Sequence, residues 1–418
     1  MDSSSSKTTP EAADADAFAE PSAALTRRPA FQAYLGCLAT FWLPGGIMAV
    51  LFPWLVAVQL AAPAEQLGLA QMALQLPTLV LVLFGGVLAD RRDPRRILLT
   101  VHLLAALPPL GLALLILHGE LNLMLLVGYA IAAGTCNALA MPARDSLLTN
   151  VAGDQIQRAV GMTMGLQFAV QIAGFALASR ADSVGPVPLL LLMAVVLAGG
   201  ALAARRLPAR TTSAAPLTGP AELLGGITAS LRSSLLWPPM LLAFGTGIFF
   251  AGSFMVLLPL FVRDVYAGGA GGIGASFTCF MLGTLVSIVV LIRAPILRQG
   301  RALILSQLAG AVVLGTLVLS VPLPGFLVAM FCWGLCGGVG MVTSRSMVQA
   351  AAPESHRGRI LGVYAMTSFG GMPIGSLLLG FVAAALGPQQ AVLVPAGAMA
   401  LLTVFVALTS PLWRQRSA

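Results

Sequence analysis

The chain has 418 residues, of which 58% are hydrophobic and only 9% are charged. Soluble domains carry roughly 25% charged residues, so this composition excludes an ordinary soluble protein and indicates an integral membrane protein. The net charge of +8 is explained by loop charges that orient such a chain in a bilayer, and we expect no nucleic-acid partner.

Apolar runs long enough to cross a bilayer repeat from Phe31 almost to the end of the chain. An α-helix needs about 20 such residues to cross a hydrocarbon core about 30 Å thick. Six predicted spans cover 31–60, 66–89, 97–117, 121–143, 157–180 and 186–204. Six more cover 238–262, 271–293, 302–321, 324–346, 359–386 and 389–411. The sequence therefore predicts an all-α integral membrane protein of about twelve transmembrane helices.

The spans divide the chain into two six-helix bundles, 31–204 and 237–411. Residues 1–30 are mostly polar and rich in Ser, Ala and Asp, which predicts a disordered cytosolic tail. Residues 205–236 are predicted to be a cytosolic linker, and 412–418 a short cytosolic tail.

Basic residues lie almost entirely on one side of the predicted spans. If the N-terminus is cytoplasmic, 21 of the 23 lysines and arginines fall in cytoplasmic segments, and only Arg180 and Arg263 fall on the other side. Such a bias in short loops predicts that both termini are cytoplasmic.

Charge is concentrated directly after the second span, in the stretch GGVLADRRDPRR (85–96). Asp93 followed by Pro94 is typical of an N-cap and a first-turn proline, and it predicts the start of the third helix. Gly86 allows close helix approach. Asp90 and the arginines remain to be explained.

The two halves of the chain are internally similar. A shift of 201 positions aligns Arg144 with Arg345, Gly161 with Gly362, Gly174 with Gly375 and other arginines and glycines in equivalent loops. Parallel six-span repeats, with a substrate site between them near the midplane, are the architecture of the major facilitator superfamily.

The stretch 85–96 resembles the signature loop of that superfamily, Gly-x-x-x-Asp-Arg followed by a basic pair. Together with MPARDSLLTNVAGDQIQRAVGM (141–162) and PESHRGRILGVYAMTSFGGMPIGSLLLG (353–380), it is similar to the enterobactin-exporter-like branch of bacterial efflux proteins. The resemblance implies a multi-pass protein of the bacterial cytoplasmic (inner) membrane that works as a monomer.

The resemblance implies gating roles near the cytoplasm. Asp90 is expected to face the start of the eleventh helix, whose N-terminus carries a partial positive charge, and to latch the cytoplasmic side shut. The full set of predicted gating residues is Gly86, Asp90, Arg91, Arg95, Arg96, Arg144 and Arg345. The alternative is that these residues only anchor the topology, and Arg144 and Arg345 pair with Asp145 or Glu354 or anchor their helices.

Uncharged polar and aromatic side chains at depth are the candidates for substrate contact. The predicted substrate-binding residues are Gln75, Asn137, Gln167, Gln171, Trp42, Phe250, Trp333 and Tyr364. Hydrogen bonds between helices are the alternative for the polar ones, and lipid-facing packing for the aromatic ones. Such a cavity favours a neutral or aromatic small molecule.

The sequence predicts a secondary transporter that works by alternating access and, from the branch resemblance, exports a small amphipathic compound such as a siderophore or a drug. An importer or facilitator, or a scaffold on the same fold, are the alternatives. A proton is one candidate for the coupling ion, although no carboxylate lies in the middle of a predicted span. We predict no enzyme activity, no cofactor and no metal site.

Overall fold

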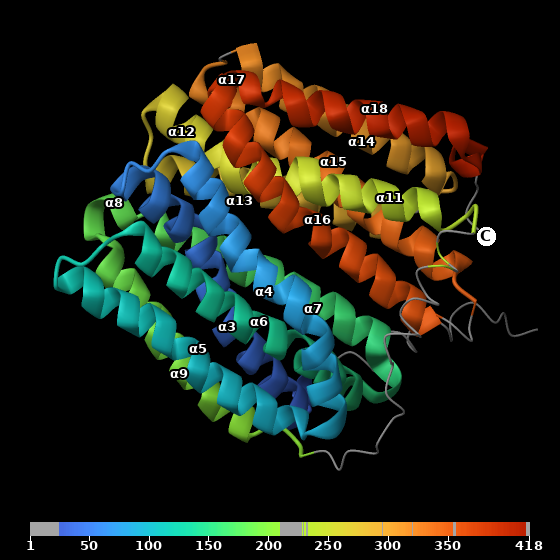
Figure 1. The fold of residues 1–418 in the computed structure, drawn as a ribbon. Coiled ribbons are helices and arrows are strands. Elements are labelled where there is room, and N and C mark those ends of the chain that lie inside the picture. Colours follow the sequence, from blue (N-terminus) through green and yellow to red (C-terminus); the bar gives the residue numbers. More distant parts are fainter. Residues whose placement is uncertain are drawn as a thin grey trace, which may run out of the picture.

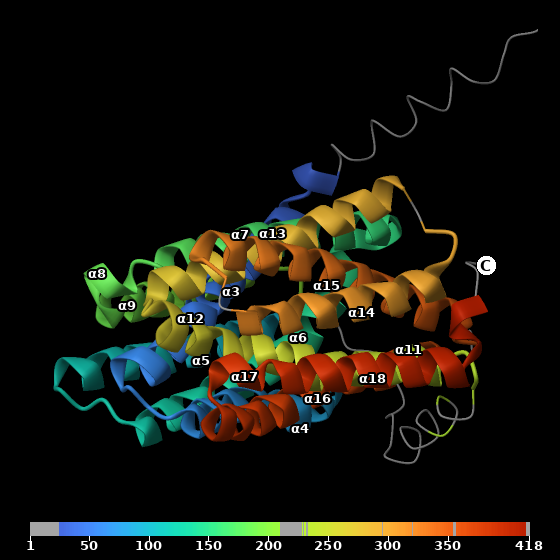
Figure 2. The same cartoon turned by 90° about the horizontal axis from the view of Figure 1, so that it is seen from above.

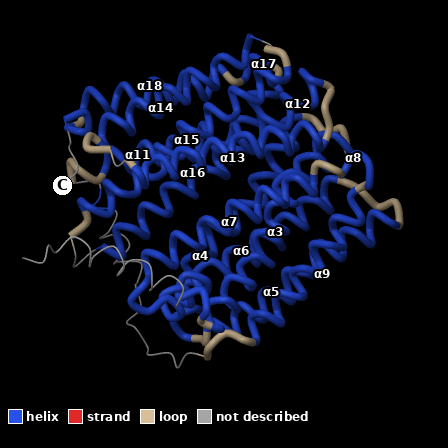
Figure 3. Tube along the Cα trace, turned by 180° about the vertical axis from the view of Figure 1, so that it is seen from behind, coloured by secondary structure: helices blue, strands red, loops and turns tan. Residues whose placement is uncertain are grey.

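The computed structural model describes residues 25–209, 228, 230, 233–294, 296–319, 321–353 and 357–414. For residues 82–91, 154 and 357–359 it describes only the backbone. Every regular element of this described part is a helix (Figures 1 and 3). The predicted tail 1–30 and linker 205–236 fall largely outside the described residues, so both stay predictions.

Six long helices of the described residues precede the predicted linker. They are α3 (Pro29–Trp54), which continues into a π-helical turn (Leu55–Gln59), α4 (Ala64–Arg91), α5 (Pro94–Leu117), α6 (Leu123–Ala152), α7 (Ile156–Ala178) and α9 (Pro186–Arg205). A one-turn helix, α8 (Ala181–Val184), joins the last two. The N-cap prediction is confirmed, because the Asp93 side chain accepts a hydrogen bond from the Arg95 amide at the start of α5.

Six more follow the linker. The first is α11 (Trp237–Gly245), which runs through two π-helical segments (Thr246–Ala251 and Ser253–Leu257) into α12 (Leu258–Tyr266). The others are α13 (Ala270–Arg293), α14 (Gln299–Thr316), α15 (Leu323–Ala351), α16 (Arg357–Leu386) and the pair α17 (Pro388–Ala391) and α18 (Leu393–Thr409). Eleven helices of the described residues are long and apolar enough to cross a membrane, and α4 adds a twelfth long helix.

The predicted ends of the fourth and tenth spans were wrong. We expected the helices to end near residues 143 and 346, but α6 continues to Ala152 and α15 to Ala351. Arg144 therefore lies about two turns inside its helix. Arginine is a good helix former, so neither Arg144 nor Arg345 has to end its helix.

The helices form two bundles that meet along a seam (Figures 1 and 2). The seam is made mainly by α4 against α16, with α7 against α13 beside it. In the first bundle α5 packs on α9, and in the second α14 packs on α18, away from the seam. We call the end of the bundles where α9 ends and α11 begins the linker end, and the opposite end, with α8, α12 and α17, the Arg263 end.

The internal repeat is also visible in the packing. Gly174 of α7 lies against Gly46 of α3, where a Cβ atom would come within 2.8 Å of the Gly46 Cα. Its counterpart Gly375 of α16 lies against Ile248 of the α11–α12 helix, where a Cβ atom would come within 2.0 Å of the Ile248 carbonyl oxygen. In both halves the small residue lets the backbones approach closely, as at other helix crossings in membranes.

The tightest crossings predict which glycines the fold requires. At Gly283 of α13 a Cβ atom would lie 2.1 Å from the Phe331 carbonyl oxygen of α15, so Gly283→Ala should destabilise the protein by about 1–3 kcal/mol through overpacking. Gly111→Ala in α5 is the control, since nothing lies within 4 Å of that Cβ position, and alanine gains up to about 1 kcal/mol in a helix. The thermal unfolding midpoint in detergent should fall for the first variant and stay or rise for the second; a fall of equal size in both would contradict the crossing.

Candidate functional site

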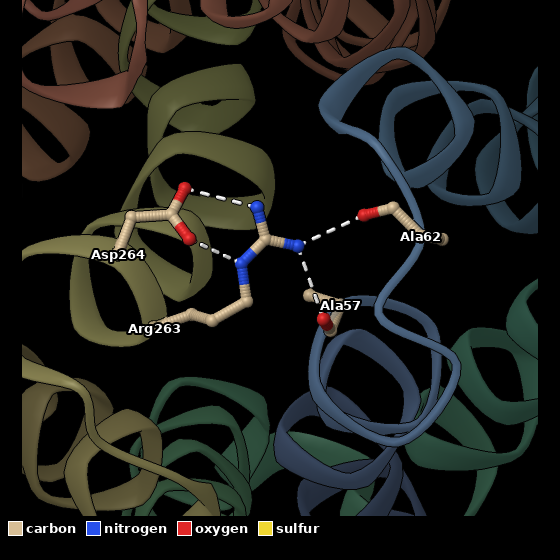
Figure 4. A network of polar contacts seen from close by, with 4 residues as sticks. All are labelled: Ala57, Ala62, Arg263 and Asp264. Carbon is tan, nitrogen blue, oxygen red and sulfur yellow. Dashed lines mark hydrogen bonds and ion pairs between the residues drawn. The ribbon is translucent and has the colours of Figure 1, made fainter.

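A cluster of polar contacts joins the two halves at the Arg263 end (Figure 4). Arg263 Nη1, at the end of α12, donates hydrogen bonds to the carbonyl oxygens of Ala57 (3.0 Å) and Ala62 (2.8 Å). These carbonyls follow the end of α3, where backbone acceptors lose their helical partners. Asp264 forms an ion pair with the same guanidinium and orients it. Arg263 thus supplies donors from the second half to free acceptors of the first.

Asp182 makes the reciprocal contact from the first half. Its Oδ1 accepts a hydrogen bond from Trp54 Nε1 (2.8 Å), which ties α8 to α3. Its Oδ2 accepts one from the Gly271 amide (3.1 Å) in the first turn of α13. The N-cap residue of α13, Gly269, makes no side-chain cap. A carboxylate of one half therefore caps a helix of the other, where the helix dipole favours negative charge.

Two glutamines of α4 make further polar contacts across the seam, nearer the middle of the bundles. Gln71, 1% exposed, donates from Nε2 to the Met255 carbonyl oxygen (3.2 Å), which lies in a π-helical segment of the second half. Gln75 donates from Nε2 to Ser376 Oγ of α16 (3.2 Å). The Oε1 atoms of both side chains are buried without a hydrogen-bond partner. At Gln75 the geometry is that of a hydrogen bond between helices, and substrate contact stays a prediction.

Arg144 is the centre of a second polar group, which lies inside the first half. It is 5% exposed, its Nη2 donates to Asn137 Oδ1 (3.2 Å), and its Nη1 has no hydrogen-bond partner. The guanidinium carbon lies 4.4 Å from the ring centroid of Phe41 and 5.0 Å from that of Trp42. The structure thus brings Trp42 and Asn137, two predicted substrate residues, to Arg144, a predicted gating residue.

Aromatic side chains form a third group in the second half. The rings of Phe250 and Trp333 meet edge to face with centroids 5.6 Å apart, and Phe254 stacks on Phe277 at 4.1 Å. Phe277 also touches Phe175 of the first half, at 5.8 Å, so this group reaches the seam. Trp333 is 1% exposed and Phe250 6% exposed, so both are packed inside the protein here, and a role in lining a cavity stays a prediction.

The other predicted substrate residues lie elsewhere. Gln167 and Gln171 are half-buried in α7, and Tyr364 of α16 packs beside a small cluster that includes Met240 and Val348. The eight predicted residues therefore fall into separate groups. Two apolar cavities, of about 340 and 130 Å³, lie along α4 and α16, and none of the eight residues lines them.

The predicted gating residues gather at the linker end, but only part of that region is described. Gly86, Asp90 and Arg91 lie where the structure describes the backbone alone, so the latch stays a prediction. Arg95 donates to the Arg205 carbonyl oxygen, which ties α5 to the end of α9, and Arg96 is exposed. Arg345 is exposed on α15 and lies within electrostatic range of the Asp145 carboxylate across the seam.

Sequence reasoning did not identify Asp182 and Arg263 as site residues. A signal was present, because both lie on the side that carries only two basic residues, where a charge does not serve to anchor the chain. Their partners across the seam are backbone atoms, and these leave no trace in the side-chain pattern. Within the described residues no group of three or more metal-ligating side chains occurs.

The Asp182 contacts make a prediction about stability. Asp182→Ala should lower the free energy of unfolding by about 1–3 kcal/mol, because it leaves the Trp54 indole N–H and an α13 amide without their acceptor. Asp264→Ala, which removes a partly exposed ion pair between neighbours, should cost less than about 1 kcal/mol. Thermal unfolding in detergent measures both; equal midpoints for the two variants would contradict the assignment.

Comparison with known proteins agrees with this arrangement. The family described as "Transmembrane secretion effector" matches residues 36–418. The chain is 25% identical to the enterobactin exporter EntS of Shigella flexneri over 87% of each chain. It is 26% identical to the multidrug efflux pump Tap of Mycobacterium tuberculosis over 80% of this chain and 82% of the pump.

Solved structures of other transporters share the fold. A mutant form of the nucleoside transporter NupG superposes with a TM-score of 0.74 at 14% identity, covering 91% of this chain and 99% of that one. A structure that describes substrate recognition in proton-dependent oligopeptide transporters gives 0.71 at 13% identity, covering 92% and 99%. The chain belongs to the transmembrane secretion effector family, and it is a membrane transporter of the major facilitator type.

Proposed function

We propose that this protein exports a small amphipathic compound, siderophore-like or drug-like, by alternating access across the bacterial cytoplasmic membrane. The linker end is the cytoplasmic end, and both termini lie on that side. The export direction is supported by the two relatives, one named an exporter and the other an efflux pump. The charge bias of the loops supports the orientation.

One observation carries the mechanism: polar contacts tie the halves together at the Arg263 end. Hydrogen bonds from Arg263, from the Gly271 amide to Asp182, and from Gln71 and Gln75 all cross the seam in the part of the bundles nearer that end. This arrangement is that of a transporter closed on its outer side. To export, these contacts must break while the linker end closes.

The seam is built from interactions that can break and re-form. Hydrogen bonds between membrane helices contribute about 0.6–2 kcal/mol each, so a few of them hold one state without trapping it. A substrate that binds one state better than the other then shifts the balance between them. At the linker end, Asp90 is the proposed latch of the opposite state, and Arg345 lies within electrostatic range of Asp145 across the seam.

Reconstituted vesicles test both the activity and the latch. With an imposed pH gradient, wild-type protein should move some members of a panel of siderophores, dyes and antibiotics. Asp90→Asn should lower turnover about tenfold or more at matched expression, because the variant cannot hold the linker end shut. Glu120→Gln, which changes an exposed carboxylate in the loop between α5 and α6, is the matched control and should leave turnover within about twofold.

Transport of no compound under any gradient would contradict the proposed function. Equal turnover in wild type and Asp90→Asn would contradict the latch alone. The same panel without a pH gradient tests whether protons drive the transport.

A further inference from the structure

Arg144 is a buried positive charge that no carboxylate of the described residues neutralises by an ion pair. Removing an ion from water costs several kcal/mol even after relaxation, so buried charges are normally paired or bind a ligand. The neighbouring Asp145 is exposed and lies within electrostatic range of Arg144, but the two make no ion pair.

The groups around Arg144 hold it in place but leave part of it free. The hydroxyl of Tyr34 donates to the Arg144 carbonyl oxygen (3.1 Å), which fixes α6 against α3. Asn137 accepts from Nη2, and the rings of Phe41 and Trp42 lie 4.4 and 5.0 Å from the guanidinium carbon. The Nη1 donors have no acceptor. The Nη2 arm of the guanidinium is thus held by Asn137, whereas the Nη1 arm makes no hydrogen bond.

We propose that this arm binds a carboxylate group of the transported compound, and that the adjacent aromatic surface binds a ring of the same molecule. A guanidinium presents its donors in a planar fork that matches carboxylate oxygens, and charge-assisted hydrogen bonds are about twice as strong as neutral ones. Phe41 and Trp42 are half-buried, so their rings are only partly covered by protein. The ligand class is therefore an aromatic carboxylate. This inference rests on the proposed function, whose substrate class it narrows.

The second half lacks this arrangement, although it is the repeat of the first. At the offset of 201 residues Arg144 corresponds to Arg345 and Asn137 to Gly338. In the first span of each half the offset is 206, as Pro53 and Pro259 show, so Phe41 corresponds to Gly247 and Trp42 to Ile248. Arg345 is exposed, whereas Arg144 is buried. An arginine that only closed a helix at the membrane surface would need no aromatic partners. The partners occur where the arginine is buried, which favours a binding role in the first half.

One cavity touches α6 one helical turn from Arg144, although Arg144 does not line it. The cavity of about 130 Å³ on the seam is lined by Met141, one helical turn before Arg144 on α6, and by residues of α4 and α16. The negative charge of Asp145 opposes an incoming anion, but Arg144 and, from the other half, Arg345 both lie within its electrostatic range and offset it.

Ligand binding by the purified full-length protein in detergent tests this proposal without transport. The probes are 2-naphthoate and the neutral 2-naphthamide, which differ mainly in charge. We expect 2-naphthoate to raise the thermal unfolding midpoint of the wild type and to bind about tenfold or more tightly than the amide, as a charge-assisted hydrogen bond predicts. Arg144→Gln should remove this preference, and Arg144→Lys should keep part of it.

Arg293→Gln is the control, because it removes an exposed arginine at the end of α13, outside the proposed site, and should leave the preference unchanged. If Arg144→Gln does not fold, Trp42→Leu tests the same site and should weaken 2-naphthoate binding severalfold. Equal affinity of wild type for acid and amide, or an unchanged preference in Arg144→Gln, would overturn the proposal. If the protein transports neutral dyes but does not prefer 2-naphthoate over the amide, this proposal is wrong and the proposed function stands. If it binds 2-naphthoate but transports no compound, the proposed function alone is contradicted.

Discussion

The structure depends on how two apolar bundles are held together at one end by a few polar contacts. Helices in a bilayer gain little from burying apolar surface against each other, because lipid is equally apolar, so close packing and hydrogen bonds decide where they meet. At the Arg263 end both are present: a guanidinium reaches the free carbonyls after α3, and Asp182 caps α13. Farther along the seam, glycines such as Gly68 and Gly380 bring α4 and α16 into backbone contact.

These contacts provide partners for backbone N–H and C=O groups that the helix ends leave without a hydrogen bond. The carbonyls after α3 and the amides at the start of α13 would otherwise face water or each other. Each half thus supplies a side chain that forms hydrogen bonds with unpaired backbone groups of the other half at this end. Because the exchanged groups are helix termini, they can be satisfied by water when the halves part, which makes the closure reversible.

Much of the fold could be predicted from the sequence, because hydrophobic length and loop charge act locally. The helix start at Asp93 and Pro94 follows from a local capping rule and is confirmed. The burial of Arg144 could not be predicted, because its partners Phe41 and Trp42 lie about 100 residues away in the chain. The Arg263 network was missed for the same reason: its acceptors are the backbone oxygens of Ala57 and Ala62. The gating roles assigned around Asp90 remain predictions.

The distance between the halves at the Arg263 end is the most direct test of this account. Spin labels at Val184 of α8 and Leu386 of α16, both exposed and on opposite halves, would report it in a background whose five free cysteines are replaced by alanine. We predict one short distance for this background, and a second, longer population when Asp182→Ala and Arg263→Ala are combined. Asp264→Ala should change the distribution less. An identical distribution with and without the Asp182 and Arg263 side chains would contradict the claim that these contacts hold the halves closed.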